Sequence, residues 1–156
     1  MSSSRKTEQK LSQKKLSQTG TVVRRTKSFY YVDVGEANPR LCRIKGNLFK
    51  VSRHLNKIAV GDEVEIDLDV EKDSGWILGI LPRRTKLSRR PALGVPEQIL
   101  VSNADTLLIV ASLRNPLFKE GLVDRFLVAA SYGGLETLLV LSKADLSTDS
   151  EIKPIK

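Results

Sequence analysis

The sequence has little of the chemistry that supports a metal site, a disulfide or a membrane anchor. It holds one cysteine, Cys42, and one histidine, His54. A single cysteine excludes an internal disulfide, and two potential ligands fall short of the three or four that zinc requires. No apolar run approaches the roughly 18 to 20 residues of a membrane span, and the N-terminus lacks the apolar stretch of a secretory signal. We therefore expect a cytoplasmic protein with no metal site and no membrane segment.

A phosphate-binding loop is also absent from the sequence. No glycine is followed by lysine, whereas the Gly-x-x-x-x-Gly-Lys-Ser/Thr loop holds phosphates with backbone N–H groups and a helix N-terminus. This absence excludes the classical order of GTPase motifs, in which that loop comes first. A permuted order, in which the loop follows the other motifs, stays open.

What the chain does have is an uneven positive charge. Its net charge is +8 with a sequence pI near 9.7, and 40% of its 156 residues are hydrophobic, which is enough for a core. Residues 1–20 carry a net charge of +4, residues 21–90 carry +6 and residues 91–156 carry −2. A contact with a polyanion such as RNA is therefore expected in the first half.

The first half reads as short strands separated by turns. Strict polar–apolar alternation over residues 63–70 marks a half-buried strand. A helical or irregular turn is expected at 50–55. Because closure removes exposed strand edges, the sequence predicts a five-stranded OB-like barrel over residues 20–82. Residues 1–19 are expected to be a disordered basic tail, and a transit peptide is the alternative for them. The other expected strands are 21–25, 28–34, 40–44 and 76–81.

Candidate RNA-binding residues follow from this charge pattern. Phe29, Tyr30 or Tyr31 can stack on bases, although core packing is the alternative for each, and strand alternation places Tyr30 opposite to the other two. Residues 83–98 are expected to be a basic linker, either solvated or in contact with RNA. The basic candidates are Arg24, Arg25, Lys27, Arg43, Lys45, Lys50, Arg53 and Lys57 in the barrel region, and Arg83, Arg84, Lys86, Arg89 and Arg90 in the linker.

The second half changes to an α/β pattern. Apolar runs at 105–111 and 136–141 predict buried strands. Between them, a helix over 121–131 places Leu122, Phe126 and Ala130 on one face, with Val123 and Leu127 alongside, and stops at Gly133-Gly134. A strand, a helix and a strand make a βαβ unit with parallel strands. Two parallel strands cannot form a complete domain, so residues 99–156 are expected to be the first part of an incomplete α/β domain.

A guanine-binding motif follows the second of these strands. Asp145 stands where a carboxylate at the C-terminal end of a parallel strand can accept hydrogen bonds from the ring N–H and the amino group of guanine, a pattern that adenine does not offer. The Lys143 stem can lie along the base while its ammonium stays in water, and Ser142 can brace a neighbouring loop. The alternative is that these are ordinary solvated loop residues.

Several segments together resemble one known family over about residues 20–147. The segments are Leu41-Cys42-Arg43 with Lys45-Gly46, Val60-Gly61-Asp62-Glu63-Val64, Arg84-Thr85 with Leu87 and Arg90-Pro91, Asn103-Ala104-Asp105, Asp124-Arg125-Phe126-Leu127, and Val140-Leu141-Ser142-Lys143-Ala144-Asp145-Leu146. They resemble the circularly permuted GTPases of small-ribosomal-subunit biogenesis, the RsgA or YjeQ family. In that family an OB domain precedes a permuted GTPase domain. The base-specificity motif also precedes the phosphate loop.

The resemblance implies a cytoplasmic, monomeric GTPase that assists late maturation of the 30S small ribosomal subunit. It implies 16S rRNA binding by the OB domain, binding of GTP or GDP with magnesium by the permuted GTPase domain, and zinc in a C-terminal domain. Ser142 stands where the family has Asn, so the bracing of the phosphate loop is weakened. The phosphate loop and the magnesium, switch and zinc motifs are not among these 156 residues. The chain is therefore interpreted as a truncated form without catalytic residues that does not hydrolyse GTP by itself.

Two alternatives to this interpretation stay open. The first is a stand-alone, non-enzymatic OB-fold protein that binds RNA. The second is a noncatalytic interaction protein without affinity for RNA.

Overall fold

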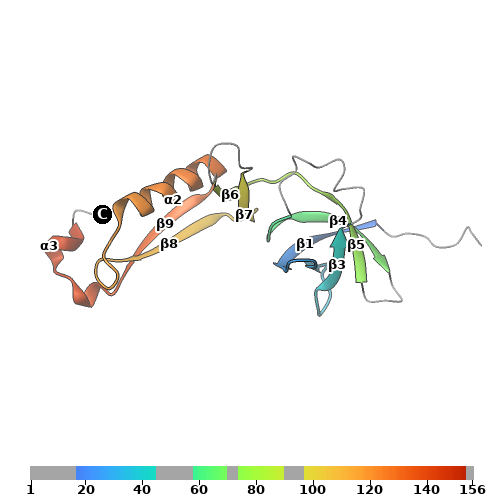
Figure 1. Ribbon diagram of the computed structural model, residues 1–156, viewed down its shortest axis with the longest axis horizontal. Helices are drawn as coiled ribbons and strands as arrows, with labels where there is room; N and C mark the ends of the chain where they lie inside the picture. The colour runs from blue at the N-terminus through green and yellow to red at the C-terminus, as the bar shows by residue number, and fades with distance from the viewer. Residues whose placement is uncertain (1–16, 45–57, 70–73, 90–96, 154–156) are drawn as a thin grey trace, which may run out of the picture. The chain divides into compact units, whose positions relative to one another are not determined.

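The computed structural model describes residues 17–44, 58–69, 74–89 and 97–153 (Figure 1). They form two compact units. The first unit holds all strands up to residue 81. The second holds the residues from 82 onward together with the segment 58–62, which the sequence had assigned to the barrel. That segment joins the second unit because the Ser102 N–H donates to the Val60 carbonyl at 3.0 Å, a contact between residues far apart in the chain.

The first unit is a closed barrel of five strands, which confirms the predicted OB-like barrel. The strands follow one another around the barrel in the order β1-β2-β3-β5-β4. The pairs are antiparallel except for β3 and β5, which run parallel. The strands are β1 (Ser17–Arg25), β2 (Tyr30–Asp33), β3 (Arg40–Ile44), β4 (Glu63–Asp69) and β5 (Ser74–Ile80).

Aliphatic side chains from all five strands fill the barrel. The alternation that marked β4 places Val64 and Ile66 inside, while Glu63 and Glu65 face out. Burying each such side chain contributes about 1.5–3 kcal/mol. Gly20 allows β1 to approach β2, because a Cβ at this position would lie 2.6 Å from the Asp33 carbonyl oxygen. The fully buried core side chains are Val22, Val32, Cys42, Val64, Ile66 and Ile77.

The first strand of the barrel is longer than predicted, and one predicted turn lies outside the described residues. β1 begins at Ser17, so residues 17–19 are in a strand rather than in the predicted disordered tail. Their pairing with β4, in which Ser17 faces Asp67, explains the longer strand. The turn expected at 50–55 lies outside the described residues.

The second unit contains the predicted βαβ arrangement, but its two strands are not buried as predicted. Leu108, Val110 and Leu138 are more than half exposed, because no element in the described part of the chain covers that face of the strand pair. β8 (Thr106–Ser112) and β9 (Glu136–Ser142) are parallel and in register, with Leu108 opposite Leu138 and Ser112 opposite Ser142. The helix α2 (Glu120–Gly133) connects them and runs along them (Figure 1). A 3-10 turn, η2 (Ala144–Leu146), and a short helix, α3 (Asp149–Ile152), follow β9.

The predicted basic linker is partly a strand. Lys86–Arg89 forms β6, which pairs antiparallel with β7 (Gln98–Ser102). Leu87 of β6 is buried and packs with Ala130 of α2 and with Leu135. The interpretation of residues 83–98 as a linker is therefore wrong for β6, because its apolar residue is part of the core of the second unit.

The helix α2 ends where the sequence predicted but buries only part of the predicted face. Gly134 adopts the left-handed conformation with φ 75°, so it caps the helix as the glycine pair indicated. The buried residues are Val123, Ala130 and Gly133, whereas Leu122 and Phe126 are exposed. The helix also packs against β6, where a Cβ at Gly133 would lie 1.7 Å from the Lys86 carbonyl oxygen. Of the residues expected on the apolar face, Val123 and Ala130 are therefore part of the packing, whereas Leu122 and Phe126 are not.

Candidate functional site

The predicted guanine-binding motif lies at the carboxyl end of the parallel strands. β9 ends at Ser142, whose hydroxyl donates to the Ala111 carbonyl of β8 at 3.2 Å. Lys143 then takes a left-handed conformation with φ 56°, which turns the chain out of the sheet and into η2. This edge of a parallel sheet is where α/β proteins bind ligands. Ser142 therefore joins two strand ends rather than reaching outward.

The loop after β8 holds the motif on both sides. The Lys143 ammonium donates to the Asn115 carbonyl. On the far side, Arg114 forms an ion pair of 2.7 Å with Glu151 of α3. The pKa of Glu151 is lowered to about 2 by a hydrogen bond from the Thr148 N–H, by the hydrogen bond from Arg114 and by the Thr148 hydroxyl. These contacts fix the segment that carries Asp145 against the loop at residues 114–115.

Asp145 is exposed in η2. Within the described part of the chain, no hydrogen bond or ion pair engages its carboxylate. Both oxygens are therefore available to a ligand, whereas a carboxylate in a structural ion pair is not. The geometry is compatible with the predicted guanine contact, and the role of Ser142, Lys143 and Asp145 stays a prediction.

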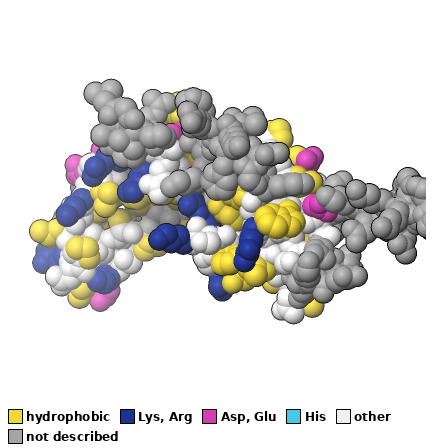
Figure 2. Space-filling view, turned by 45° about the vertical axis from the view of Figure 1, so that its right-hand side comes forward, with side chains coloured by type: hydrophobic (Ala, Val, Ile, Leu, Met, Phe, Trp, Pro, Cys, Tyr) yellow, Lys and Arg dark blue, Asp and Glu magenta, His cyan; other side chains and the backbone are white. Residues whose placement is uncertain are grey.

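The barrel presents basic and aromatic side chains together. The Arg24 guanidinium lies 4.2 Å from the centre of the Tyr31 ring, and Arg43 lies 4.8 Å from the centre of the Phe29 ring. Tyr30 is buried in the core, so the predicted alternation of the three aromatic residues holds. In Figure 2, basic side chains lie directly against hydrophobic ones on the visible face. Such pairs of arginine and aromatic rings are typical of surfaces that bind nucleic acid.

One exposed aromatic residue was not among the predicted RNA-binding residues. Trp76 of β5 is 44% exposed and lies opposite Arg43 in the parallel pairing of β3 and β5. The alternation of Gly75, Trp76 and Ile77 in the sequence could have placed it on the outer face. What the sequence did not show is that β5 pairs with β3.

The predicted basic residues occupy different environments. In the barrel, Arg24, Arg25, Lys27 and Arg43 are exposed. Near β6, three cations contact carboxylates of the same unit: Arg83 with Asp62, Arg84 with Asp105, and Lys86 with Glu97. Arg89 donates to the Gln98 side chain. The protein's own acids therefore offset much of the repulsion expected in this segment, and each RNA contact stays a prediction. Lys45, Lys50, Arg53, Lys57 and Arg90 lie outside the described residues.

Arg83 takes part in a buried polar cluster. Its Nε and Nη2 atoms donate to the Asp62 carboxylate at 2.6 Å and 2.8 Å, and Asp62 is fully buried. The Ser102 hydroxyl and the Ala59 N–H donate to the same carboxylate at 2.6 Å and 2.8 Å. Burial alone would raise the pKa of Asp62, but the hydrogen bonds from Arg83, Ser102 and Ala59 outweigh it and hold the pKa below its usual value. Two of the five N–H donors of the Arg83 guanidinium are thereby bound to Asp62.

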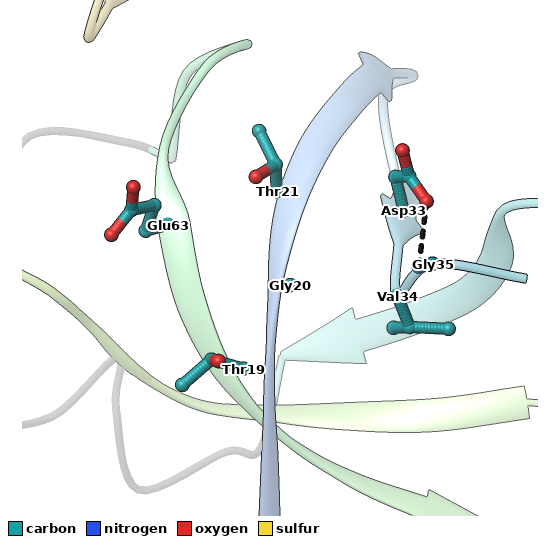
Figure 3. Close-up of a pocket in the computed structure, with 7 residues that line it drawn as sticks. All are labelled: Thr19, Gly20, Thr21, Asp33, Val34, Gly35 and Glu63. Carbon is teal, nitrogen blue, oxygen red and sulfur yellow. Dashed lines mark hydrogen bonds between the residues drawn. The ribbon is translucent and has the colours of Figure 1, made fainter.

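A shallow pocket on the barrel is unsuited to phosphate. It is lined by Thr19, Gly20, Thr21, Asp33, Val34, Gly35 and Glu63 (Figure 3). Asp33 accepts a hydrogen bond from the Gly35 N–H at 2.9 Å, and the Glu63 carboxylate stands on the other side. Two carboxylates repel a phosphate group, so this pocket is not a candidate nucleotide site.

Family models match both units of the chain. The model described as the RsgA N-terminal domain matches residues 19–77, and the model described as RsgA GTPase matches residues 80–156. The chain belongs to the RsgA family. The RsgA N-terminal match covers the barrel, and the RsgA GTPase match covers the βαβ unit with the predicted guanine-binding motif.

Curated relatives and solved structures agree with the RsgA assignment. A small ribosomal subunit biogenesis GTPase RsgA from Halalkalibacterium halodurans is 38% identical over 138 residues, which are 88% of this chain and 42% of the relative. One from Flavobacterium psychrophilum is 37% identical over 81% of this chain and 40% of the relative. The crystal structure of YjeQ from Thermotoga maritima matches with 30% identity and a TM-score of 0.64, and covers 90% of this chain and 46% of that structure.

A second solved structure is that of YloQ, described as a circularly permuted GTPase. It is 26% identical to this chain, with a TM-score of 0.61 and coverage of 90% of this chain and 45% of that structure. The chain thus spans somewhat less than half the length of these RsgA relatives. No helix among the described residues has both the length and the apolar character needed to cross a membrane.

Proposed function

We propose that this chain recognises the guanine of GTP or GDP and binds 16S ribosomal RNA, as part of a cytoplasmic GTPase that assists late maturation of the 30S subunit. The observation that supports the proposal most is the exposed Asp145 carboxylate at the carboxyl end of two parallel strands, in a chain of the RsgA family. The names of the curated relatives, small ribosomal subunit biogenesis GTPases, support the link to the 30S subunit.

Asp145 has the chemistry that guanine recognition requires. A carboxylate accepts from the N1–H and the 2-amino group of guanine at the same time, and charge strengthens both hydrogen bonds. Adenine has neither donor at this edge, so the carboxylate distinguishes the two purines. The Lys143 ammonium donates to the Asn115 carbonyl, and we expect its stem to lie along the base.

Phosphoryl transfer needs groups that these 156 residues do not supply. Magnesium and a phosphate-binding loop carry most of the binding and catalysis of the triphosphate in GTPases. Among the described residues, no group of three His, Cys, Asp or Glu side chains could hold a metal ion. We therefore expect the purified chain to bind guanine weakly and to leave GTP intact.

Nucleoside binding to the purified chain tests the guanine site. Saturation-transfer NMR with guanosine, adenosine and xanthosine measures the base contact without phosphates. We expect a preference for guanosine over adenosine. The Asp145→Asn variant is expected to weaken guanosine binding by about 10- to 100-fold, as for the loss of a charged acceptor. It should also favour xanthosine, since an amide can donate to the 2-carbonyl oxygen that replaces the amino group.

A matched control is Asp124→Asn, which changes an exposed aspartate of α2. It should leave guanosine binding unchanged. Equal binding of guanosine and adenosine by the unmodified chain, or equal loss in both variants, would count against the guanine site.

The RNA part of the proposal rests on the charge and the aromatic residues of the barrel. Filter binding of the chain to 30S subunits at low and moderate salt measures it. Because released counterions drive such binding, we expect the affinity to fall steeply as salt rises. Absence of salt-sensitive binding would refute the RNA role and leave the guanine site untouched.

A further inference from the structure

The outer face of the barrel carries a continuous band of aromatic and arginine side chains across four strands. The pairing register places Arg24 of β1 opposite Tyr31 of β2. Tyr30 of β2 pairs with Cys42 of β3, and both side chains point inward. Because the two strands are antiparallel, Phe29 comes to lie beside Arg43, and the Arg43 guanidinium contacts the Phe29 ring.

Trp76 extends this band onto β5. It lies opposite Arg43 in the β3–β5 pairing, and its neighbours Gly75 and Ile77 are buried, so Trp76 faces outward. Adjacent strands are about 4.8 Å apart. The indole of Trp76 and the ring of Phe29 therefore stand on either side of the Arg43 strand, within reach of the same ligand.

A local irregularity of β1 helps to form this band. The register of β1 against β2 shifts between Val22 and Arg24, which is the mark of a β-bulge. Val22 points into the core and is fully buried. Without the extra residue, Arg24 would share that inward face, whereas the bulge turns it outward over Tyr31.

The rings of the band differ in what covers them. Arginines cover Tyr31 and Phe29. In the part of the chain that the structure describes, no Lys or Arg lies over the Trp76 ring, and 44% of this residue is exposed. An indole with a free face is the best stacking surface that a protein offers to a nucleobase.

Charge sets how a nucleic acid would lie on the band. Arg43 stands on one side of Trp76, and Asp67 of β4 faces Trp76 on the other. Phosphates are attracted to the arginine side. A strand of RNA therefore fits with its backbone toward Arg43 and Arg24 and with a base over Trp76.

We propose that Trp76, together with Arg43 and Phe29, stacks an unpaired base of the bound RNA. This proposal rests on the proposed RNA binding of the barrel and names the kind of RNA that it takes. Bases inside an A-form duplex are stacked on one another and cannot reach an aromatic side chain, whereas bases in single strands, loops and bulges can. The band therefore selects unpaired RNA over duplex.

Trp76 is the single tryptophan of the chain, so its fluorescence reports directly on stacking. The full chain is titrated with a short single-stranded RNA of mixed sequence and with a blunt duplex of the same length. Anisotropy of a fluorescein label on the RNA measures binding independently. We expect the single strand to bind and to quench Trp76, and the duplex to bind through its charge with little quenching.

Variants separate stacking from charge. Trp76→Ala is expected to weaken single-strand binding by about tenfold and to leave duplex binding within about twofold, in line with the loss of one stacked base. Trp76→Phe keeps an aromatic face and should restore most of the affinity. Tyr132→Ala, which removes another exposed aromatic residue that contacts a lysine, is the matched control and should have no effect.

The outcomes distinguish this proposal from the one on which it rests. If the single strand binds without quenching, and Trp76→Ala binds it as well as the unmodified chain, the stacking proposal is overturned while RNA binding stands. Absence of any RNA binding overturns both. Equal quenching by the single strand and the duplex would refute the selection of unpaired bases.

Discussion

Breaking the buried pair of Asp62 and Arg83 should strongly destabilise the second unit, and Arg83→Ala tests this. The Asp62 carboxylate is fully buried and accepts four hydrogen bonds, two of them from Arg83. Truncation leaves a buried charge with two donors. Removing one partner of a buried ion pair costs about 3–5 kcal/mol. We expect about 3 kcal/mol, the low end of that range, because two donors remain and the Arg83 side chain is 18% exposed.

The neighbouring residue supplies a matched control. Arg84 pairs with Asp105 at 3.2 Å, but its side chain is 64% exposed. Exposed ion pairs contribute about 0–1 kcal/mol because water screens them. Arg84→Ala should therefore change the free energy of unfolding of the second unit by less than about 1 kcal/mol, although it removes the same charge one residue away.

The effect of Arg83→Ala should also depend on pH. The pKa of Asp62 is held below its ordinary value in the folded protein, against the effect of burial. Such a carboxylate stabilises the fold fully above the unfolded pKa of about 3.9, and this contribution is lost as the pH falls through the lower folded pKa. The difference between Arg83→Ala and the unmodified chain should therefore shrink as the pH falls below about 4.

Amide hydrogen exchange at several urea concentrations measures these effects unit by unit. The relevant amides are those of β7, β8 and β9, because they report on the second unit alone. Equal losses of stability in Arg83→Ala and Arg84→Ala would refute the reasoning. So would an Arg83→Ala effect that stays constant between pH 6 and pH 3.

Two further predictions concern packing. Gly133→Ala should destabilise the second unit by about 1–3 kcal/mol, because its Cβ would lie 1.7 Å from the Lys86 carbonyl oxygen. In the control variant Gly121→Ala of the same helix, the new Cβ meets nothing within 4 Å, so the change should be neutral or stabilising. Hydrogen exchange compares the stability of the two variants. The Cys42 side chain is fully buried, and burial raises its pKa to about 11. Iodoacetamide near pH 8 should therefore label Cys42 far more slowly in the folded chain than in the urea-unfolded chain. Mass spectrometry measures the labelled fraction over time. Rapid labelling of the folded chain would show that the barrel core is open.

Local patterns in the sequence determined much of this fold. The alternation in β4 predicted which side chains face the barrel core, and Val64 and Ile66 are indeed fully buried. Gly133-Gly134 predicted the end of α2, because only glycine adopts the left-handed conformation there without strain. Continuous apolar runs predicted the parallel strands β8 and β9, and with them the sheet edge that carries Asp145. In each case the physical cause acts within a few residues of the chain.

Tertiary structure decided which distant residues meet. Asp62 contacts Arg83 and Ser102, which lie 21 and 40 positions further along the chain, and no local period encodes such a pairing. The placement of Trp76 beside Arg43 depends on the pairing of β3 with β5. Strand pairing and helix packing are set by the whole hydrophobic core, since a shift of one residue reverses the face of every side chain. The sequence therefore determined the chemistry of each site, and only the closed barrel and the packed sheet determined which side chains act together.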